Sequence, residues 1–165
     1  AKKLGATVIG CVGDEEKAAL AVANGCDHPI LYRDEDIPKR VKELTGGKGV
    51  QAAYDSIGKA TFMDSLDSLA PCGVLATFGN ASGKVEPFDP GILAPKGSLY
   101  VTRPTLGTHT ATRELVLDGT KKLFDAVTSG DVKISVNQTY ELKDVAKAHA
   151  DLEARKTTGS TVLTV

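Results

Sequence analysis

The chain reads Thr7-Val8-Ile9-Gly10-Cys11-Val12-Gly13-Asp14-Glu15-Glu16-Lys17 near its beginning. A β-branched run leads into a glycine turn, and a charged segment of helix-forming residues follows at once. This pattern predicts a strand that passes directly into a helix. In a dinucleotide-binding sheet, the end of the second strand is the place where the ribose is recognised. The segment therefore indicates the second strand–helix unit of such a sheet.

The residues in front of this segment predict the end of another helix. Ala1-Lys2-Lys3-Leu4-Gly5-Ala6 has the character of a last helical turn with a glycine stop. We therefore expect a Rossmann-like, doubly wound parallel α/β sheet that is truncated at its N-terminus, without its first strand and glycine-rich loop. Residues 1–165 would form a partial dinucleotide-binding domain.

Strand and helix patterns alternate along the rest of the chain, which is typical of β-α-β units with a parallel sheet. Strands are predicted over residues 7–11, 28–32, 50–55, 74–78, 98–102, 134–136, 139–140 and 161–165. Helices are predicted over residues 14–24, 34–44, 60–69, 91–94, 111–129 and 142–156. The one long connection is 80–90, and no shift in composition marks a domain boundary.

Composition excludes several classes of protein. A net charge of −1 gives no electrostatic basis for binding nucleic acid or an anionic membrane. No apolar run approaches the roughly 18 residues of a membrane-spanning helix. The three cysteines, Cys11, Cys26 and Cys72, are far apart, which favours reduced, mostly buried thiols in a cytoplasmic protein. No spacing of histidine and cysteine indicates a metal site.

The usual phosphate-binding and catalytic motifs are also missing. Gly47-Lys48-Gly49-Val50-Gln51-Ala52 matches a G-x-G-x-x-A pattern by its letters, but it follows a predicted helix and opens a strand. No Walker A sequence and no serine nucleophile motif are present. The sequence therefore predicts no catalytic side chain.

Candidate binding residues lie where the predicted strands end. Lys17 stands in a first helical turn, where the dipole favours anions, so a phosphate on the ribose would explain it. No acid ends the strand before it, which favours NADP over NAD. Asp14 would repel that phosphate, and the alternative is a capping Asp14 beside a solvated Lys17. Tyr32 and Arg33 end the next strand, where they could face the adenosine or belong to a solvated loop.

Small residues end two further strands, at 55–58 and 77–80. They suit a backbone that approaches a ligand closely, although ordinary turn chemistry explains each stretch equally well.

Six segments in order resemble one family. They are Val8-Ile9-Gly10-Cys11-Val12-Gly13 with Lys17, Leu31-Tyr32-Arg33, Tyr54-Asp55-Ser56-Ile57-Gly58, Phe78-Gly79-Asn80-Ala81-Ser82-Gly83, Lys96-Gly97-Ser98-Leu99-Tyr100-Val101-Thr102-Arg103-Pro104 and Arg155-Lys156-Thr157-Thr158-Gly159-Ser160. The chain is similar to the zeta-crystallin-like NADPH:quinone oxidoreductases of the medium-chain dehydrogenase/reductase superfamily. The resemblance covers nearly all of it.

The resemblance implies a zinc-independent enzyme that transfers hydride from NADPH, with NADH a poorer donor, to a quinone or similar electrophile. It implies cofactor contacts from Gly13, Lys17, Tyr32, Ser56, Phe78, Gly79, Asn80, Val101, Thr102, Arg103 and Arg155. Where this chain has Asp14, the family has a small hydroxyl residue, which weakens the preference for NADP. The family's GroES-like catalytic domain would precede residue 1, so this chain alone is not expected to be a competent enzyme.

Two other functions stay open. One is reduction of an enone such as a 2-alkenal by the same superfamily, and the other is a non-enzymatic, crystallin-like structural protein. The family also forms dimers through this domain, and Ser98–Thr102 is the expected edge of a homodimer.

Overall fold

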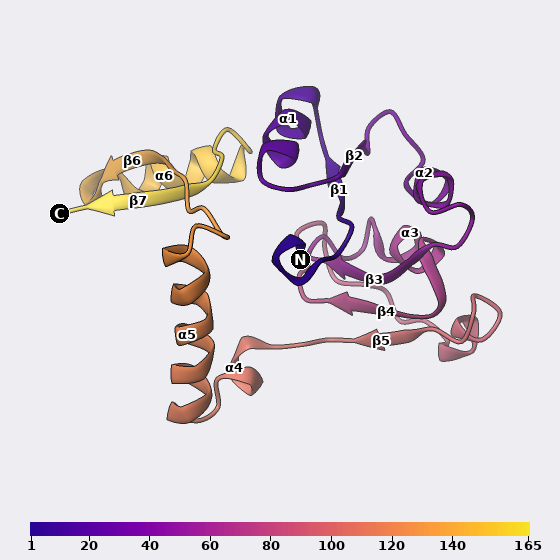
Figure 1. Ribbon diagram of the computed structural model, residues 1–165. Coiled ribbons are helices and arrows are strands. Elements are labelled where there is room, and N and C mark those ends of the chain that lie inside the picture. Colours follow the sequence, from indigo (N-terminus) through magenta and orange to yellow (C-terminus); the bar gives the residue numbers. More distant parts are fainter. The chain divides into compact units, whose positions relative to one another are not determined.

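Seven strands, paired only in parallel, form three separate sheets in the computed structural model, which describes residues 1–165 (Figure 1). The chain divides into two compact units, Ala1–Ala111 and Thr112–Val165, which are described separately below. The parallel α/β class predicted from the sequence is confirmed. The predicted single sheet is not formed. Strand β1 pairs only with β2, and β3 pairs only with β4, so no hydrogen bonds join these two sheets.

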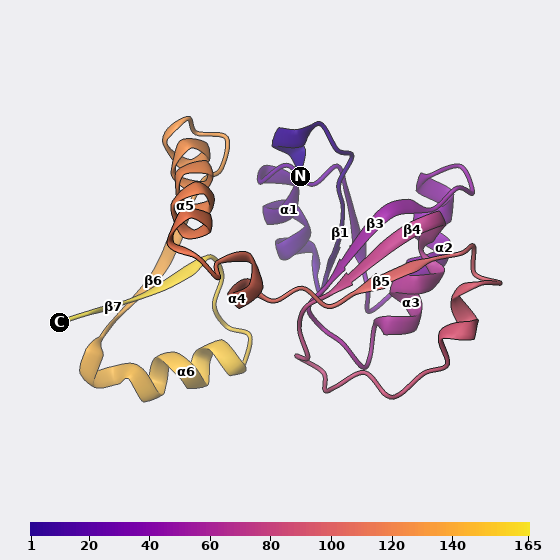
Figure 2. The same ribbon diagram turned by 90° about the horizontal axis from the view of Figure 1, so that it is seen from below.

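The first unit begins with the short 3-10 helix η1 (Lys2–Leu4) and a two-stranded sheet. Strand β1 (Ile9–Val12) pairs with β2 (His28–Leu31), so that Val12 lies opposite Leu31. Helix α1 (Glu15–Ala23) connects the two strands and packs against both. Figure 2 shows it beside β1. This is the strand–helix unit predicted from the opening segment.

A three-stranded sheet in the order β3-β4-β5 completes the first unit. Its elements in chain order are α2 (Ile37–Leu44), β3 (Val50–Asp55), α3 (Phe62–Asp67), β4 (Leu69–Thr77), the 3-10 helix η2 (Pro90–Leu93), β5 (Tyr100–Thr102) and α4 (Leu106–His109). Helix α3 covers β3 and β4, and α2 contacts both α3 and β2. The core is a cluster of Phe62, Leu66, Leu69, Leu75 and Leu99.

Strand β4 corrects the predicted boundary between a helix and a strand. The sequence predicted a helix to residue 69 and a strand from residue 74, whereas the strand already begins at Leu69 and includes Pro71. The register with β3 shifts between Leu69 and Val74, so the extra residues bulge out of the ladder. Cys72 lies in this bulge with φ 59°, and its N–H donates to the Gly97 carbonyl at 2.8 Å. A bulge accommodates a proline, which has no N–H for the ladder.

The second unit contains α5 (Arg113–Thr128), β6 (Val136–Glu141), the 3-10 helix η3 (Leu142–Asp144), α6 (Val145–Glu153) and β7 (Ser160–Thr164). The predicted helix 111–129 starts at Arg113 because the Thr112 hydroxyl caps it. The two short extended pieces predicted between 134 and 140 form one strand, β6. It pairs with β7, and α6 packs against it.

The cysteines were predicted to be mostly buried, and this is wrong. Cys11 and Cys72 are exposed and Cys26 is half-buried, and all three are free thiols. Cys11 lies on a strand with one neighbour and Cys72 lies in a bulge, so neither position offers a full packing shell. None of the helices combines the length and the apolar character that crossing a bilayer requires.

Candidate cofactor-binding site

The corner where β1 and β2 end brings Gly13 and Tyr32 into contact. The two strands are parallel, and the Tyr32 N–H donates to the Val12 carbonyl at 3.1 Å. A Cβ atom on Gly13 would meet the Tyr32 hydroxyl at 3.0 Å and its ring at 3.4 Å. The absence of a side chain at Gly13 therefore lets the Tyr32 ring lie across the turn. Tyr32 stays 41% exposed, so part of the ring is open to a ligand.

Helix α1 starts in the same corner, with Asp14 as its cap. Its Oδ1 accepts from the Lys17 backbone N–H at 2.9 Å, and its Oδ2 lies 3.8 Å from the Lys17 Nζ. The structure thus confirms the cap, and Lys17 stands in a loose ion pair with it. Arg33 follows Tyr32, and its guanidinium makes no hydrogen bond or ion pair within the chain. The corner therefore holds two cations, Lys17 and Arg33.

Asp55 organises the loop after β3. Its buried carboxylate accepts hydrogen bonds from the Ile57 and Gly58 N–H groups at 2.7 and 3.0 Å. It also accepts from the hydroxyls of Thr61 and Ser65 at 2.8 and 2.9 Å. Burial alone would raise the pKa of this carboxyl, but the four hydrogen bonds outweigh it and lower the pKa below its ordinary value.

Sequence reasoning treated Asp55 only as part of a small-residue turn and missed this network. The signal that could have found it is the spacing of Thr61 and Ser65, which places two hydroxyls one helical turn apart.

The loops after β3 and β4 are hydrogen-bonded into one assembly. Gly79 passes so close to Ser56 that a Cβ atom at position 79 would lie 2.1 Å from the Ser56 carbonyl oxygen. The Ser82 N–H and hydroxyl both donate to the Ile57 carbonyl at 2.8 Å. The N–H of Lys59 donates to the Gly83 carbonyl at 3.1 Å. These contacts hold 56–59 and 79–83 in fixed relation.

Arg103 ties the end of β5 to the same loops. Its Nη1 donates to the Gly79 carbonyl at 3.1 Å and reaches the Thr77 hydroxyl at 3.4 Å. No carboxylate pairs with this guanidinium. It therefore keeps its positive charge uncompensated beside the loops.

The predicted residues thus fall into three groups. Gly13, Lys17 and Tyr32 meet at the ends of β1 and β2. A second group lies at the ends of β3, β4 and β5, with Phe78, Asn80 and Thr102 exposed and Val101 half-buried: Ser56, Phe78, Gly79, Asn80, Val101, Thr102 and Arg103. Arg155 belongs to the second unit, where it follows α6 with φ 58°.

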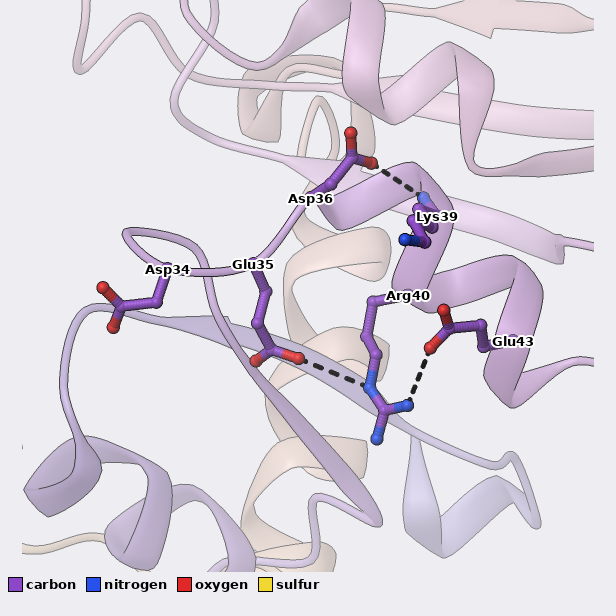
Figure 3. Close-up of a pocket in the computed structure, with 6 residues that line it drawn as sticks. All are labelled: Asp34, Glu35, Asp36, Lys39, Arg40 and Glu43. Carbon is purple, nitrogen blue, oxygen red and sulfur yellow. Dashed lines mark hydrogen bonds and ion pairs between the residues drawn. The ribbon is translucent and has the colours of Figure 1, made fainter.

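A separate charged pocket lies between β2 and α2 (Figure 3). It is lined by Asp34, Glu35, Asp36, Lys39, Arg40 and Glu43. Arg40 pairs with Glu35 at 3.4 Å and with Glu43 at 3.0 Å. Glu35 also accepts from the Leu31 N–H at 2.7 Å, and Asp36 caps α2. Arg40, Glu35 and Glu43 neutralise one another and Asp36 stabilises the start of α2, so these four residues have structural roles.

Comparisons with known proteins identify the family of this chain. Residues 1–122 match the family of zinc-binding dehydrogenases. The chain belongs to this family. A quinone oxidoreductase of Pseudomonas aeruginosa is 50% identical over 163 residues, which are 99% of this chain and 50% of that protein. The 2-haloacrylate reductase of a Burkholderia species is 47% identical over 167 residues, or 99% of this chain and 49% of that protein.

A solved structure extends this likeness to three dimensions. The crystal structure of Escherichia coli quinone oxidoreductase complexed with NADPH superposes with a TM-score of 0.95 at 47% identity. The match covers 100% of this chain and 51% of that one. The family resemblance predicted from the six segments is thereby confirmed. The chain spans about half the length of the curated relatives it matches.

The name of this dehydrogenase family refers to zinc, and the described residues do not fit that metal. They contain no group of three or more His, Cys, Asp or Glu residues that could hold an ion. We therefore derive no step through zinc.

Proposed function

We propose that this chain is the NADP(H)-binding portion of an oxidoreductase that transfers hydride from NADPH to a quinone. The observation that carries the proposal is the corner of Gly13, Tyr32 and Lys17 at the ends of β1 and β2, where a dinucleotide-binding sheet recognises the ribose. The names of the relatives support it, since the similar proteins are quinone oxidoreductases and one was solved with NADPH.

Each group of residues has its own task in this proposal. The Lys17 ammonium attracts the phosphate on the adenosine ribose, and the exposed part of Tyr32 lies against the adenosine. The loop 78–80 and the segment 101–103 line the nicotinamide, with Arg103 fixed on the Gly79 carbonyl. Arg155 would complete the set. The bound nicotinamide supplies the hydride, and the protein's residues position it.

A binding experiment on the complete protein tests the cofactor preference. Lys17→Ala should weaken NADPH about 10-fold, because one cation facing a phosphate contributes about 1–2 kcal/mol. NADH has no ribose phosphate, so its dissociation constant should change less than about 2-fold. Isothermal titration with both nucleotides measures this, and Lys39→Ala is the matched control, since that lysine lies in the charged pocket. Equal effects on both nucleotides would refute the phosphate contact.

A second candidate activity is reduction of an activated carbon–carbon double bond. It is favoured by the 47% identity to 2-haloacrylate reductase. Quinones and enones both accept hydride, and we expect this chain to hold little of the pocket that would distinguish them. Steady-state turnover of the complete protein with a quinone, a 2-alkenal and 2-chloroacrylate would distinguish the two activities. No turnover with any acceptor would favour the non-enzymatic, crystallin-like alternative.

We further propose a homodimer through the Ser98–Thr102 edge. Strand β5 ends the order β3-β4-β5, so its outer edge has no partner strand. Tyr100 on this strand is 60% exposed. A second copy would pair the open edge, which single chains otherwise leave as a site of aggregation. The zinc-independence and the GroES-like domain stay predictions of the resemblance, and the cytoplasmic location stays a prediction from the three cysteines.

A further inference from the structure

We propose that Asp14 is a specificity-determining residue that competes with the ribose phosphate and so narrows the preference for NADPH over NADH. The inference rests on the proposed function, because it concerns the same corner of β1, α1 and β2. It adds that Asp14 weakens the binding of NADPH without weakening the binding of NADH.

The two carboxylate oxygens of Asp14 each face a group that a phosphate would use. Oδ1 accepts from the Lys17 backbone N–H at 2.9 Å, which is one of the free donors of the first turn of α1. Oδ2 lies 3.8 Å from the Lys17 ammonium. A phosphate that binds between the helix end and Lys17 must therefore share both groups with an anion already present.

Within the first turn of α1, the charges leave no positive surplus to offset this competition, and Arg33 after β2 is the only other cation of the corner. Glu15 and Glu16 are exposed in the same first turn, and Lys17 is the single cation of that turn. The phosphate of NADPH is a dianion, and within about 4 Å the negative Asp14 carboxylate repels it. NADH brings only hydroxyls to the same place, and a carboxylate accepts hydrogen bonds from ribose hydroxyls. Asp14 therefore weakens the binding of NADPH and does not weaken the binding of NADH.

The alternative is that Asp14 only caps α1. A cap stabilises the helix whichever nucleotide is present, so its loss would change both affinities alike. Serine and asparagine are also good caps, which makes it possible to remove the charge and keep the cap. The two roles are thus separable by choice of substitution.

The test measures NADPH and NADH dissociation constants by isothermal titration of the complete protein and of Asp14→Ser, with the isosteric Asp14→Asn as the second variant. NADPH should bind about 5- to 30-fold more tightly to both variants, because one like charge near the phosphate is gone. The NADH constant should stay unchanged or weaken. Glu15→Gln is the matched control, since it removes a charge from the same turn without touching Lys17, and it should change NADPH less than about 3-fold.

A double-mutant cycle tests whether Asp14 acts on NADPH binding through Lys17. In a Lys17→Ala background, Asp14→Ser should no longer give the full gain, because the two side chains interact directly. An unchanged NADPH-to-NADH ratio in both Asp14 variants, with NADPH still bound by the unaltered protein, would overturn this inference alone. A gain in Glu15→Gln as large as in Asp14→Ser would also overturn it. If the unaltered protein binds neither nucleotide, the proposed function itself fails.

Discussion

A single buried carboxylate shows how much one residue contributes to this fold. Asp55 satisfies two N–H groups and two hydroxyls at the start of α3, and the loop it shapes is in turn bonded to the loop after β4. We expect Asp55→Asn to lower the free energy of unfolding by about 2–4 kcal/mol, since hydrogen bonds to a charged group contribute more than neutral ones. Urea unfolding at pH 7 measures this, with the exposed Asp34→Asn as control.

The pH dependence of stability follows from the same residue. The folded protein holds the Asp55 pKa below the value of about 3.9 for an unfolded aspartate. The unfolded chain therefore takes up the proton first as the pH falls. The stabilisation is complete above about pH 5 and is lost as the pH drops through the folded pKa. Asp55→Asn should flatten the stability profile below pH 5 in unfolding experiments, and an unchanged slope would contradict this.

Helix α5 contains a glycine in its interior, which lowers the stability of the helix. Gly119 lies inside the helix, and a Cβ atom there would meet nothing within 4 Å. Gly119→Ala should stabilise the second unit by about 0.5–1 kcal/mol, because alanine restricts the unfolded chain and favours the helix. Gly130 is the matched control, since it also faces open space but has φ 81° after the helix end. There alanine should destabilise, and thermal unfolding followed by circular dichroism compares the two variants.

Elements also show which predictions local patterns support. The strand Val50–Asp55 has the predicted bounds, and α1 begins after the predicted cap Asp14. Both depend on residues close in sequence. The start of β4 at Leu69 was missed, because a bulge with a hydrogen bond from Cys72 to Gly97 compensates for the proline. That contact joins residues far apart along the chain, so no local pattern indicates it.

The molecule as a whole offers the β5 edge for self-association. If two copies pair along this edge, Tyr100→Lys places like charges near one another across the new ladder and weakens the pair. We expect light scattering to show a dimer for the unaltered protein and a monomer for the variant. Tyr54→Lys is a suitable control, because Tyr54 is also exposed but lies on β3, away from that edge. A monomer at high concentration without any substitution would contradict the proposed dimer.

The candidate site depends both on local sequence patterns and on contacts between segments far apart in the chain. Alternating strand and helix patterns, caps and glycine turns are local properties, and they were enough to predict the parallel α/β class. The family was predicted from the resemblance of six ordered segments. The contact of Tyr32 with Gly13, the network around Asp55 and the Arg103 hydrogen bond to Gly79 arose only from the folded chain. The first and third of these interactions join the ends of different strands, and the second joins the end of β3 to α3. Their geometry depends on strand register and loop packing, which no short segment specifies.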